Sequence, residues 1–220
     1  DNLTVFASAN QAGRLPTFTD LYYSDPESKG NTDLKPEKST SIEAGVKYSN
    51  DFVSSSISVF RSIGKDVIDW VRQSDTTICT AQNQSEIISS GFQISLNLSP
   101  KAIVGEKCLI KQISLSYTFV DNLKDDFEMT SKSSLDHLKH KFSSSIAIQL
   151  PIGIGLDMRA GYQERFGTYY SSKLDRETEY QPVALISARL YYRHSDYYFY
   201  FDADNLLDRK YQDIGNLELP

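Results

Sequence analysis

The sequence contains few cysteines and no basic tract. Cys79 and Cys108 are the two cysteines in 220 residues, which is too few for a fold built on disulfides, and their spacing fits no cysteine-based metal site. The 23 Lys and Arg residues are scattered among 29 Asp and Glu residues, and the net charge is -6. Proteins that bind nucleic acid usually carry a basic surface, so we expect no nucleic-acid partner.

Long apolar runs are missing as well. The longest uncharged stretch, residues 142–156, contains Pro151 and is shorter than the roughly 20 apolar residues of a transmembrane helix. Residues 1–11 lack the basic region and apolar core of a signal peptide, and the chain opens within a strand pattern without Met. We expect no transmembrane helix, and we interpret the chain as a piece of a longer protein.

What the sequence does contain is strand-forming residues in strict alternation. Tyr (14) and Phe (11) are plentiful, and aromatic side chains favour strands. In residues 42–48, apolar Ile42, Ala44 and Val46 alternate with Glu43 and Lys47, so one face is apolar and the other is charged. The alternation recurs in residues 92–98, 113–119, 142–150, 154–163, 183–192 and 197–202.

The alternating segments predict an all-β, antiparallel fold of about nine strands, each of about 9 to 14 residues, which is longer than is usual in globular sheets. We predict short turns at 50–51, 151–153 and 193–196, and long polar loops at 10–39, 74–85, 122–136 and 166–180. The connection at residues 99–109 is the exception, because it falls at the end with the short turns but is itself longer. Short turns at one rim and long loops at the other are typical of transmembrane β-barrels.

The turns also predict strand register. The turn at 151–153 would place Ile148 opposite Leu156, and the turn at Asn50 would place Ala44 opposite Ile57, so that apolar residues face each other. About nine strands cannot close a bacterial barrel, which needs an even number. We therefore expect an open, curved sheet with at least one strand missing.

Three stretches, taken in order, resemble the C-terminal part of the barrel of TonB-dependent outer-membrane receptors. They are "RLPTFTDLYY" followed by "GNTDLKPEKSTSIEAGVKY", then "DVIDWV", and finally "DNLLDRKYQDIG". Further motifs, "SLDHLKHKF", "YQPVALISARLYY" and "YQDIGNLELP", are most similar to the vitamin B12 receptor group.

The resemblance implies a barrel of about 22 strands around an N-terminal plug, in the cell outer membrane of a Gram-negative bacterium. Such a receptor imports a scarce nutrient with energy from an inner-membrane complex that reaches it through the plug. Residues 1–220 would be the C-terminal portion of the barrel, without plug, earlier strands or closing strand. A cobalamin-like nutrient is favoured, a siderophore is the alternative, and a passive porin or adhesin barrel is the rival class. No cofactor is expected.

Ligand contacts are predicted in the long loops. Aromatic rings and one cation suit a large, flat ligand with polar edges, although packing of the loops explains the same residues equally well. The candidates are Arg14, Tyr22, Tyr23, Phe166, Tyr169 and Tyr170, together with the loop around residues 76–82. Arg14 and Pro16 belong to a motif shared by receptors for different ligands, which favours a role in folding the loop.

Charged residues on the polar face are predicted to line the barrel lumen and meet the plug. This set comprises Glu43, Lys47, Asp157, Arg159, Arg189 and Asp202. Asp202 and Asp204 share a face and could resemble a catalytic pair, but we favour a charge ladder with Arg189.

Other chemistry is disfavoured. His137 and His140, with Asp136 nearby, could suggest a metal site, but three residues apart on a regular strand they would point to opposite faces. Ser133 and Ser134 with His137 lack the orienting acid of a hydrolase, so we expect no enzyme. Aromatics near strand ends, such as Tyr48, suit membrane interfaces. Cys79 and Cys108 are predicted at opposite rims and hence not disulfide-bonded.

Overall fold

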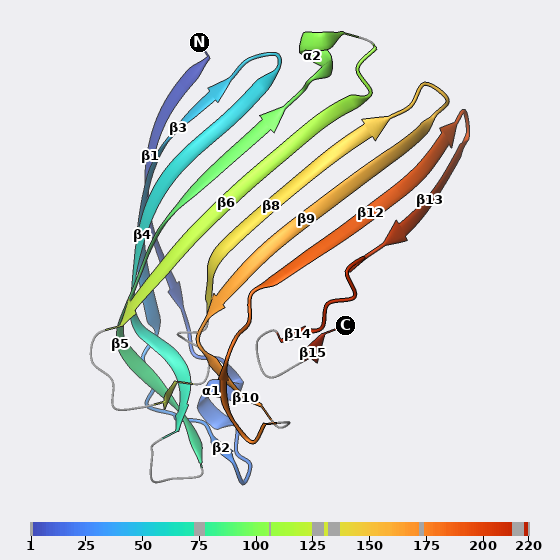
Figure 1. The fold of residues 1–220 in the computed structure, drawn as a ribbon. Coiled ribbons are helices and arrows are strands. Elements are labelled where there is room, and N and C mark those ends of the chain that lie inside the picture. The colour runs from blue at the N-terminus through green and yellow to red at the C-terminus, as the bar shows by residue number, and fades with distance from the viewer. Residues whose placement is uncertain are drawn as a thin grey trace.

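A curved, open antiparallel sheet dominates the structure (Figure 1). The computed structural model describes residues 2–72, 78–105, 107–124, 130–131, 137–171, 174–212 and 218–219. Within these residues, nine long strands lie in the order β1, β3, β4, β5, β6, β8, β9, β12 and β13, each antiparallel to the next. The all-β prediction, its strand count and its open edge are confirmed.

The nine strands are β1 (Leu3–Arg14), β3 (Glu37–Ser49), β4 (Val53–Arg72), β5 (Cys79–Leu98), β6 (Ile110–Lys124), β8 (His137–Gln149), β9 (Ile154–Phe166), β12 (Val183–His194) and β13 (Tyr197–Ala203). Shorter elements are α1 (Phe18–Tyr22), β2 (Ser28–Lys29), α2 (Lys101–Val104), β7 (Thr130–Ser131), β10 (Thr168–Ser171), β11 (Arg176–Glu179), β14 (Tyr211–Gln212) and β15 (Glu218–Leu219).

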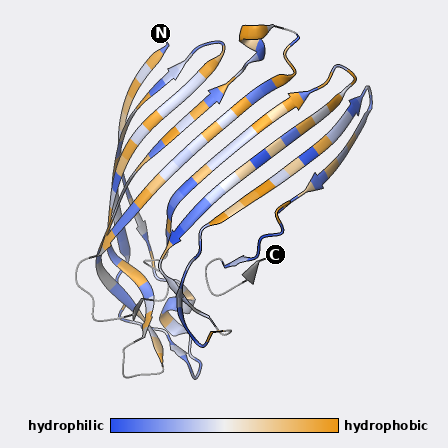
Figure 2. Ribbon diagram, viewed as in Figure 1, coloured by the Kyte–Doolittle hydropathy of each residue, from blue (hydrophilic) through white to orange (hydrophobic). Residues whose placement is uncertain are grey.

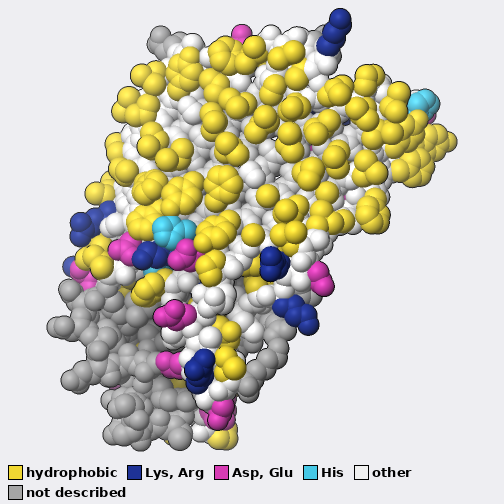
Figure 3. All heavy atoms as spheres, in the orientation of Figure 1, with side chains coloured by type: hydrophobic (Ala, Val, Ile, Leu, Met, Phe, Trp, Pro, Cys, Tyr) yellow, Lys and Arg dark blue, Asp and Glu magenta, His cyan; other side chains and the backbone are white. Residues whose placement is uncertain are grey.

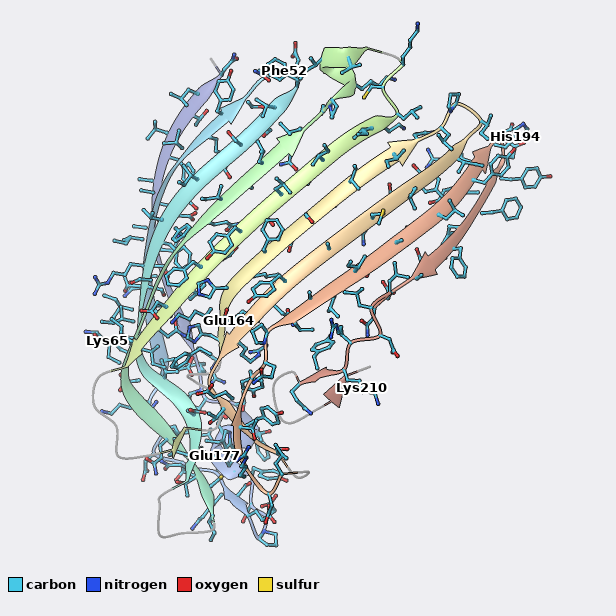
Figure 4. The ribbon with its side chains drawn as sticks, in the orientation of Figure 1. Phe52, Lys65, Glu164, Glu177, His194 and Lys210 are labelled. Atoms are coloured by element: carbon cyan, nitrogen blue, oxygen red, sulfur yellow. The ribbon has the colours of Figure 1, made fainter. Side chains whose placement is uncertain are left out.

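Connections of two kinds lie at opposite ends of the sheet (Figure 1). The turns at 50–52, 150–153 and 195–196 and the α2 connection at 99–109 form what we call the short-turn rim. The opposite end, which we call the long-loop rim, carries α1, β2 and the hairpin of β10 and β11. Figure 4 shows the two ends by labelled residues, with Phe52 and His194 at the short-turn rim and Glu177 beyond the other.

One face of the sheet is apolar and exposed. Hydropathy alternates along each strand in Figure 2, and hydrophobic side chains form a broad band across the face shown in Figure 3. Ile57 and Val59 remain 49% and 57% exposed, although burying such side chains is normally the main source of stability. No helix in the described ranges is long and apolar enough to cross a membrane.

A small hydrophobic core lies at the long-loop rim rather than along the sheet. Buried Leu34, Ile68 and Ala81 form it, and Leu21 and Trp70 pack against them. The core therefore fixes the loop containing residues 15–36 against the outer halves of β4 and β5.

The prediction of a long loop at 74–85 was wrong for residues 79–85, which lie in β5, and residues 74–77 are outside the described residues. β4 and β5 are each 20 residues long, and their pairing continues from Val67 opposite Gln84 to Arg72 opposite Cys79. The polar composition of residues 82–86 suggested a loop, but β2 pairs with the start of β5 and supports it there. We call residues 66–72 and 79–86 the β4–β5 ribbon.

Strand register was predicted correctly at one turn and wrongly at another. Ile148 lies opposite Leu156, as expected, but Ala44 lies opposite Val59 rather than Ile57. The Asn50 side-chain oxygen accepts hydrogen bonds from the backbone N–H groups of residues 52 and 53, at 3.0 and 2.8 Å. This Asx-type turn is centred on residues 51–52, which moves the register by two residues and keeps the same faces together.

Both cysteines are free. Cys79 is the buried first residue of β5 rather than a loop residue, whereas Cys108 follows α2 at the opposite rim. They therefore lie at opposite ends of the sheet, as predicted (Figure 1).

Aromatic rings on the polar face lie over glycines of the neighbouring strand. The pairs are Phe6 with Gly45, Phe60 with Gly91, and Tyr191 with Gly155. A glycine leaves room for the ring to lie flat along the sheet, which is a known way of stabilising glycine in strands.

Gly91→Ala should therefore destabilise the sheet by about 1–3 kcal/mol, as overpacking does. A Cβ atom at Gly91 would overlap the Phe119 carbonyl oxygen of the next strand as well as the Phe60 ring. The matched control is Gly161→Ala, where the nearest neighbour of the added atom is the Phe142 carbonyl oxygen at 3.9 Å. Urea unfolding in detergent micelles measures both changes, and equal losses of stability would contradict this account.

Candidate functional site

The loop that follows β1 folds around a short helix, α1. Thr17 caps it: the Thr17 hydroxyl accepts from the Asp20 backbone N–H at 3.1 Å, and the Asp20 carboxylate accepts from the Thr17 N–H at 2.9 Å. This reciprocal pair is a capping box. Pro16 precedes it and has no N–H to donate to a strand, so β1 ends at Arg14.

Arg14 joins this helix to the sheet. Its guanidinium lies 3.2 Å from the Asp20 carboxylate and 2.7 Å from the Glu37 carboxylate. Glu37 also accepts the backbone N–H of Ile68 at 2.7 Å, so one cation and two carboxylates connect β1, α1, β3 and β4. The Arg14 side chain predicted as a ligand contact is thus already bound to two carboxylates of the chain.

Asn83 fixes the other end of the loop. Its side-chain amide accepts from the Lys35 N–H at 2.8 Å and donates to the Lys35 carbonyl at 2.9 Å. It also donates to the Asp66 carbonyl at 2.6 Å. Together, Arg14, Asp20, Glu37 and Asn83 form what we call the loop clasp, which holds residues 15–36 on the β4–β5 ribbon.

Burial and hydrogen bonding shift the pKa of the Asp20 carboxyl in opposite directions. Burial alone would raise the pKa of its carboxyl, but hydrogen bonds from Thr17 and the charge of Arg14 outweigh it and hold the pKa below its ordinary value of 3.8. The carboxylate therefore stays ionised at neutral pH.

The clasped loop presents aromatic rings beside a cavity of about 630 Å³. Tyr22 and Tyr23 are 58% and 46% exposed, and the Tyr23 ring meets Trp70 edge-on at 6.2 Å. The Tyr23 hydroxyl donates to Asp25 at 2.9 Å. Tyr22, Tyr23, Lys29, Asn31, Thr80 and Gln82 are among the lining residues. Rings, hydroxyls and amides of this kind suit a ligand with a flat body and polar edges.

The other predicted ligand residues lie on or near β9. Tyr169, in β10, packs against Tyr180 at 5.1 Å, and Tyr170 pairs with Glu177 of β11 through the backbone. Phe166 is the last residue of β9 rather than a loop residue, and its ring lies 5.6 Å from that of His137. It continues the apolar alternation of Met158 and Tyr162. The cavity and the Phe166 ring therefore belong to different surfaces.

The charged residues predicted in the lumen share the polar face. Strand register places them all on one side. Arg159 lies in a row of hydroxyl and amide side chains across the strands, which comprises Ser54, Asn97, Ser114, Ser145 and Ser187. Arg189 forms a two-point ion pair with Asp202 at 2.6 and 2.9 Å, as the turn predicted. Lys47 lies over the Phe6 ring, and Asp157 is opposite Arg189. Glu43 lies opposite Phe60 on this side.

Comparison with known proteins now decides the family. The family model described as "TonB dependent receptor-like, beta-barrel" matches residues 1–206. The chain belongs to this family. A 94-residue stretch is 35% identical to the vitamin B12 transporter BtuB of Vibrio vulnificus, and it covers 43% of this chain and 15% of that protein.

Solved structures agree on the receptor fold. The copper transporter OprC is 14% identical with a TM-score of 0.71, over 96% of this chain and 32% of its own. The ferric enterobactin receptor PfeA of Pseudomonas aeruginosa is 18% identical with a TM-score of 0.70, over 98% of this chain and 34% of its own. The chain thus spans about a third of the length of these structures.

The prediction that His137 and His140 point to opposite faces of their strand was wrong. A β-bulge between Leu138 and His140 adds one residue, so His137 and His140 pair with Phe166 and Glu164 and share a face. The His140 ring nitrogen Nδ1 lies 2.8 Å from the Tyr117 hydroxyl. No group of three potential metal ligands occurs in the described ranges. Ser133, Ser134 and Asp136 lie outside those ranges.

Asp20→Asn should loosen the loop of residues 15–36 by about 1 kcal/mol, because an amide weakens both the capping box and the Arg14 ion pair. Limited proteolysis of the loop measures the change. Asp33→Asn is the control, since Asp33 is exposed on the same loop. Equal cleavage of the two variants would contradict a structural role of the clasp.

Acid should release the clasp at low pH. A depressed pKa contributes stability that is present above the ordinary value of 3.8 and is lost as the pH falls through the lowered value. Fluorescence of Trp70, which contacts Tyr23, should stay constant from neutral pH to about pH 4 and change below it. The pKa of Glu37 is lowered as well, because hydrogen bonds from Arg14 and the Ile68 N–H outweigh its burial. Asp20→Asn should therefore reduce that transition and leave the part due to Glu37, and an unchanged titration in this variant would exclude Asp20 as a source.

Proposed function

We propose that this chain is part of an outer-membrane active transporter of a Gram-negative bacterium, which imports a cobalamin-like nutrient. The 94-residue similarity to a vitamin B12 transporter carries the choice of nutrient. The energy would come from the inner-membrane TonB complex through a plug domain outside this chain. The proposal transfers the function of one related protein to this chain, which matches part of that protein's length.

The two faces of the sheet support placement in a membrane. Outer-membrane lipid would cover the apolar face, where Ile57 and Val59 are exposed and Figure 3 shows the hydrophobic band. The polar face would line the lumen, as in barrels that enclose water or a plug. The residues assigned to plug contact and hydration are Glu43, Lys47, Asp157, Arg159, Arg189 and Asp202.

The long-loop rim would face the outside and receive the nutrient. Tyr22 and Tyr23 are our first ligand residues, because they are exposed beside the cavity and are held there by the clasp. Tyr169 and Tyr170, in β10 at the same rim, are the second pair of ligand residues that we propose. Arg14 would act by positioning the loop, since its guanidinium binds Asp20 and Glu37.

Tyr22→Ala and Tyr23→Ala should each weaken nutrient binding roughly tenfold, which corresponds to about 1.4 kcal/mol for a lost ring contact. Equilibrium binding of cyanocobalamin to the full-length protein in detergent measures this. Phe166→Ala is the matched control, because it removes an aromatic ring that packs beside His137 and does not line the cavity.

The same assay distinguishes the alternatives. Saturable binding of a ferric siderophore but not of cyanocobalamin would make the protein a siderophore receptor. Solute flux that a protonophore does not reduce, with no saturable binding, would indicate a passive porin. Either result would overturn the proposal.

A further inference from the structure

The α2 connection between β5 and β6 is the longest at the short-turn rim. Its helical turn is closed within the connection: Val104 donates to the Pro100 carbonyl at 2.9 Å and Gly105 to the Lys101 carbonyl at 2.8 Å. Gly105 has a φ of 89°, a conformation that glycine adopts readily, and it ends the turn. Because these backbone groups are satisfied internally, the helical turn can meet lipid at low cost.

Both ends of this connection are attached to neighbouring turns. The Ser99 N–H donates to the Phe52 carbonyl at 2.8 Å, and the Gln149 N–H donates to the Leu109 carbonyl at 2.8 Å. The connection is therefore fixed between the turns at 50–52 and 150–153. Figure 4 shows Phe52 next to α2 at this rim.

Exposed apolar side chains run across these three turns. Ile103 and Val104 are 68% and 66% exposed. The others are Phe52, Leu109, Leu150 and Ile152, and we call the six residues the rim patch. Leu150 continues the alternation of Ile146 and Ile148, so the rim patch is continuous with the apolar face of the sheet.

Two lysines lie close in sequence to the rim patch. Lys107 lies three residues after the end of α2, next to Glu106 in the sequence, and Lys111 is the second residue of β6. Both lysines are exposed. Aliphatic residues flanked by lysines are the pattern of segments that lie in a membrane interface, where the ammonium groups reach the phosphates and the apolar side chains reach the acyl chains.

We propose that α2 and the rim patch insert into the periplasmic leaflet of the outer membrane, with Lys107 and Lys111 binding phospholipid phosphates. Phospholipid is the occupant that fits both the continuity with the apolar face and the positive charge at its edge. In a turn exposed to water, the aliphatic side chains of Ile103 and Val104 would be solvated unfavourably. This inference rests on the proposed outer-membrane placement of the sheet.

Spin labels on the full-length protein test the proposal. The label is placed at Ile103→Cys, with Cys79→Ala and Cys108→Ser, in nanodiscs of phosphatidylethanolamine and phosphatidylglycerol. Accessibility to oxygen, which partitions into lipid, is compared with accessibility to a water-soluble nickel chelate. Leu115→Cys, on the apolar face, is the lipid reference, and Asp196→Cys, at another short turn, is the water reference.

We expect the Ile103 label to lose accessibility to nickel and gain accessibility to oxygen relative to the Asp196 label. Lys107→Gln with Lys111→Gln should shift the Ile103 label toward the water reference. If the Leu115 label lies in lipid and the Ile103 label lies in water, the inference is overturned and the proposed function is not. If the Leu115 label lies in water, the proposed function itself is contradicted. An Ile103 label reached by neither reagent would show a protein partner and also overturn the inference.

Discussion

The backbone hydrogen bonds between neighbouring strands are the constraint on which this structure depends. A sheet with an exposed apolar face cannot rely on a buried core, and in the membrane that we propose for it an unpaired N–H or C=O group would have no water to satisfy it. Each of the nine long strands is therefore paired along nearly its whole length with the strand that precedes or follows it in the chain. The small core around Leu34, Ile68 and Ala81 stabilises the loops rather than the wall.

Because side chains alternate along each strand, this ladder also separates the chemistry of the two faces. Aliphatic residues such as Ile57 and Ile94 pair across the apolar face, while hydroxyl, amide and charged side chains share the other. Aromatic rings on the polar face, such as Phe60 over Gly91, lie flat along the wall. The polar face can thus carry large residues whose rings stay close to the sheet.

Much of this arrangement could be predicted from alternation and turn residues. The residues 151–153 fixed the pairing of Ile148 with Leu156, and the turn after His194 brought Arg189 to Asp202. The errors have local causes that pattern does not reveal. The Asn50 side chain moves the centre of one turn by one residue. β2 supports the β4–β5 ribbon, whose polar sequence is typical of a loop. A bulge beside His140 places His137 on the same face of the strand as His140.

The candidate site was less predictable than the sheet. Exposed Tyr22 and Tyr23 could be selected by residue type, but the loop clasp depends on Asn83, which is 48 residues from its partner Lys35. Sequence spacing gives no sign of such a contact, since it exists only once β3, β4 and β5 are paired.

The clasp has a consequence for affinity and its kinetics. Residues 15–36 lose their conformational freedom when the barrel folds, so a ligand that contacts Tyr22 and Tyr23 does not incur that entropic cost again on arrival. A rigid surface of this kind favours fast capture at low concentrations, because association needs no prior rearrangement on this side. Any closure over the ligand would then fall to the hairpin of β10 and β11, whose strands pair with each other and not with the large sheet.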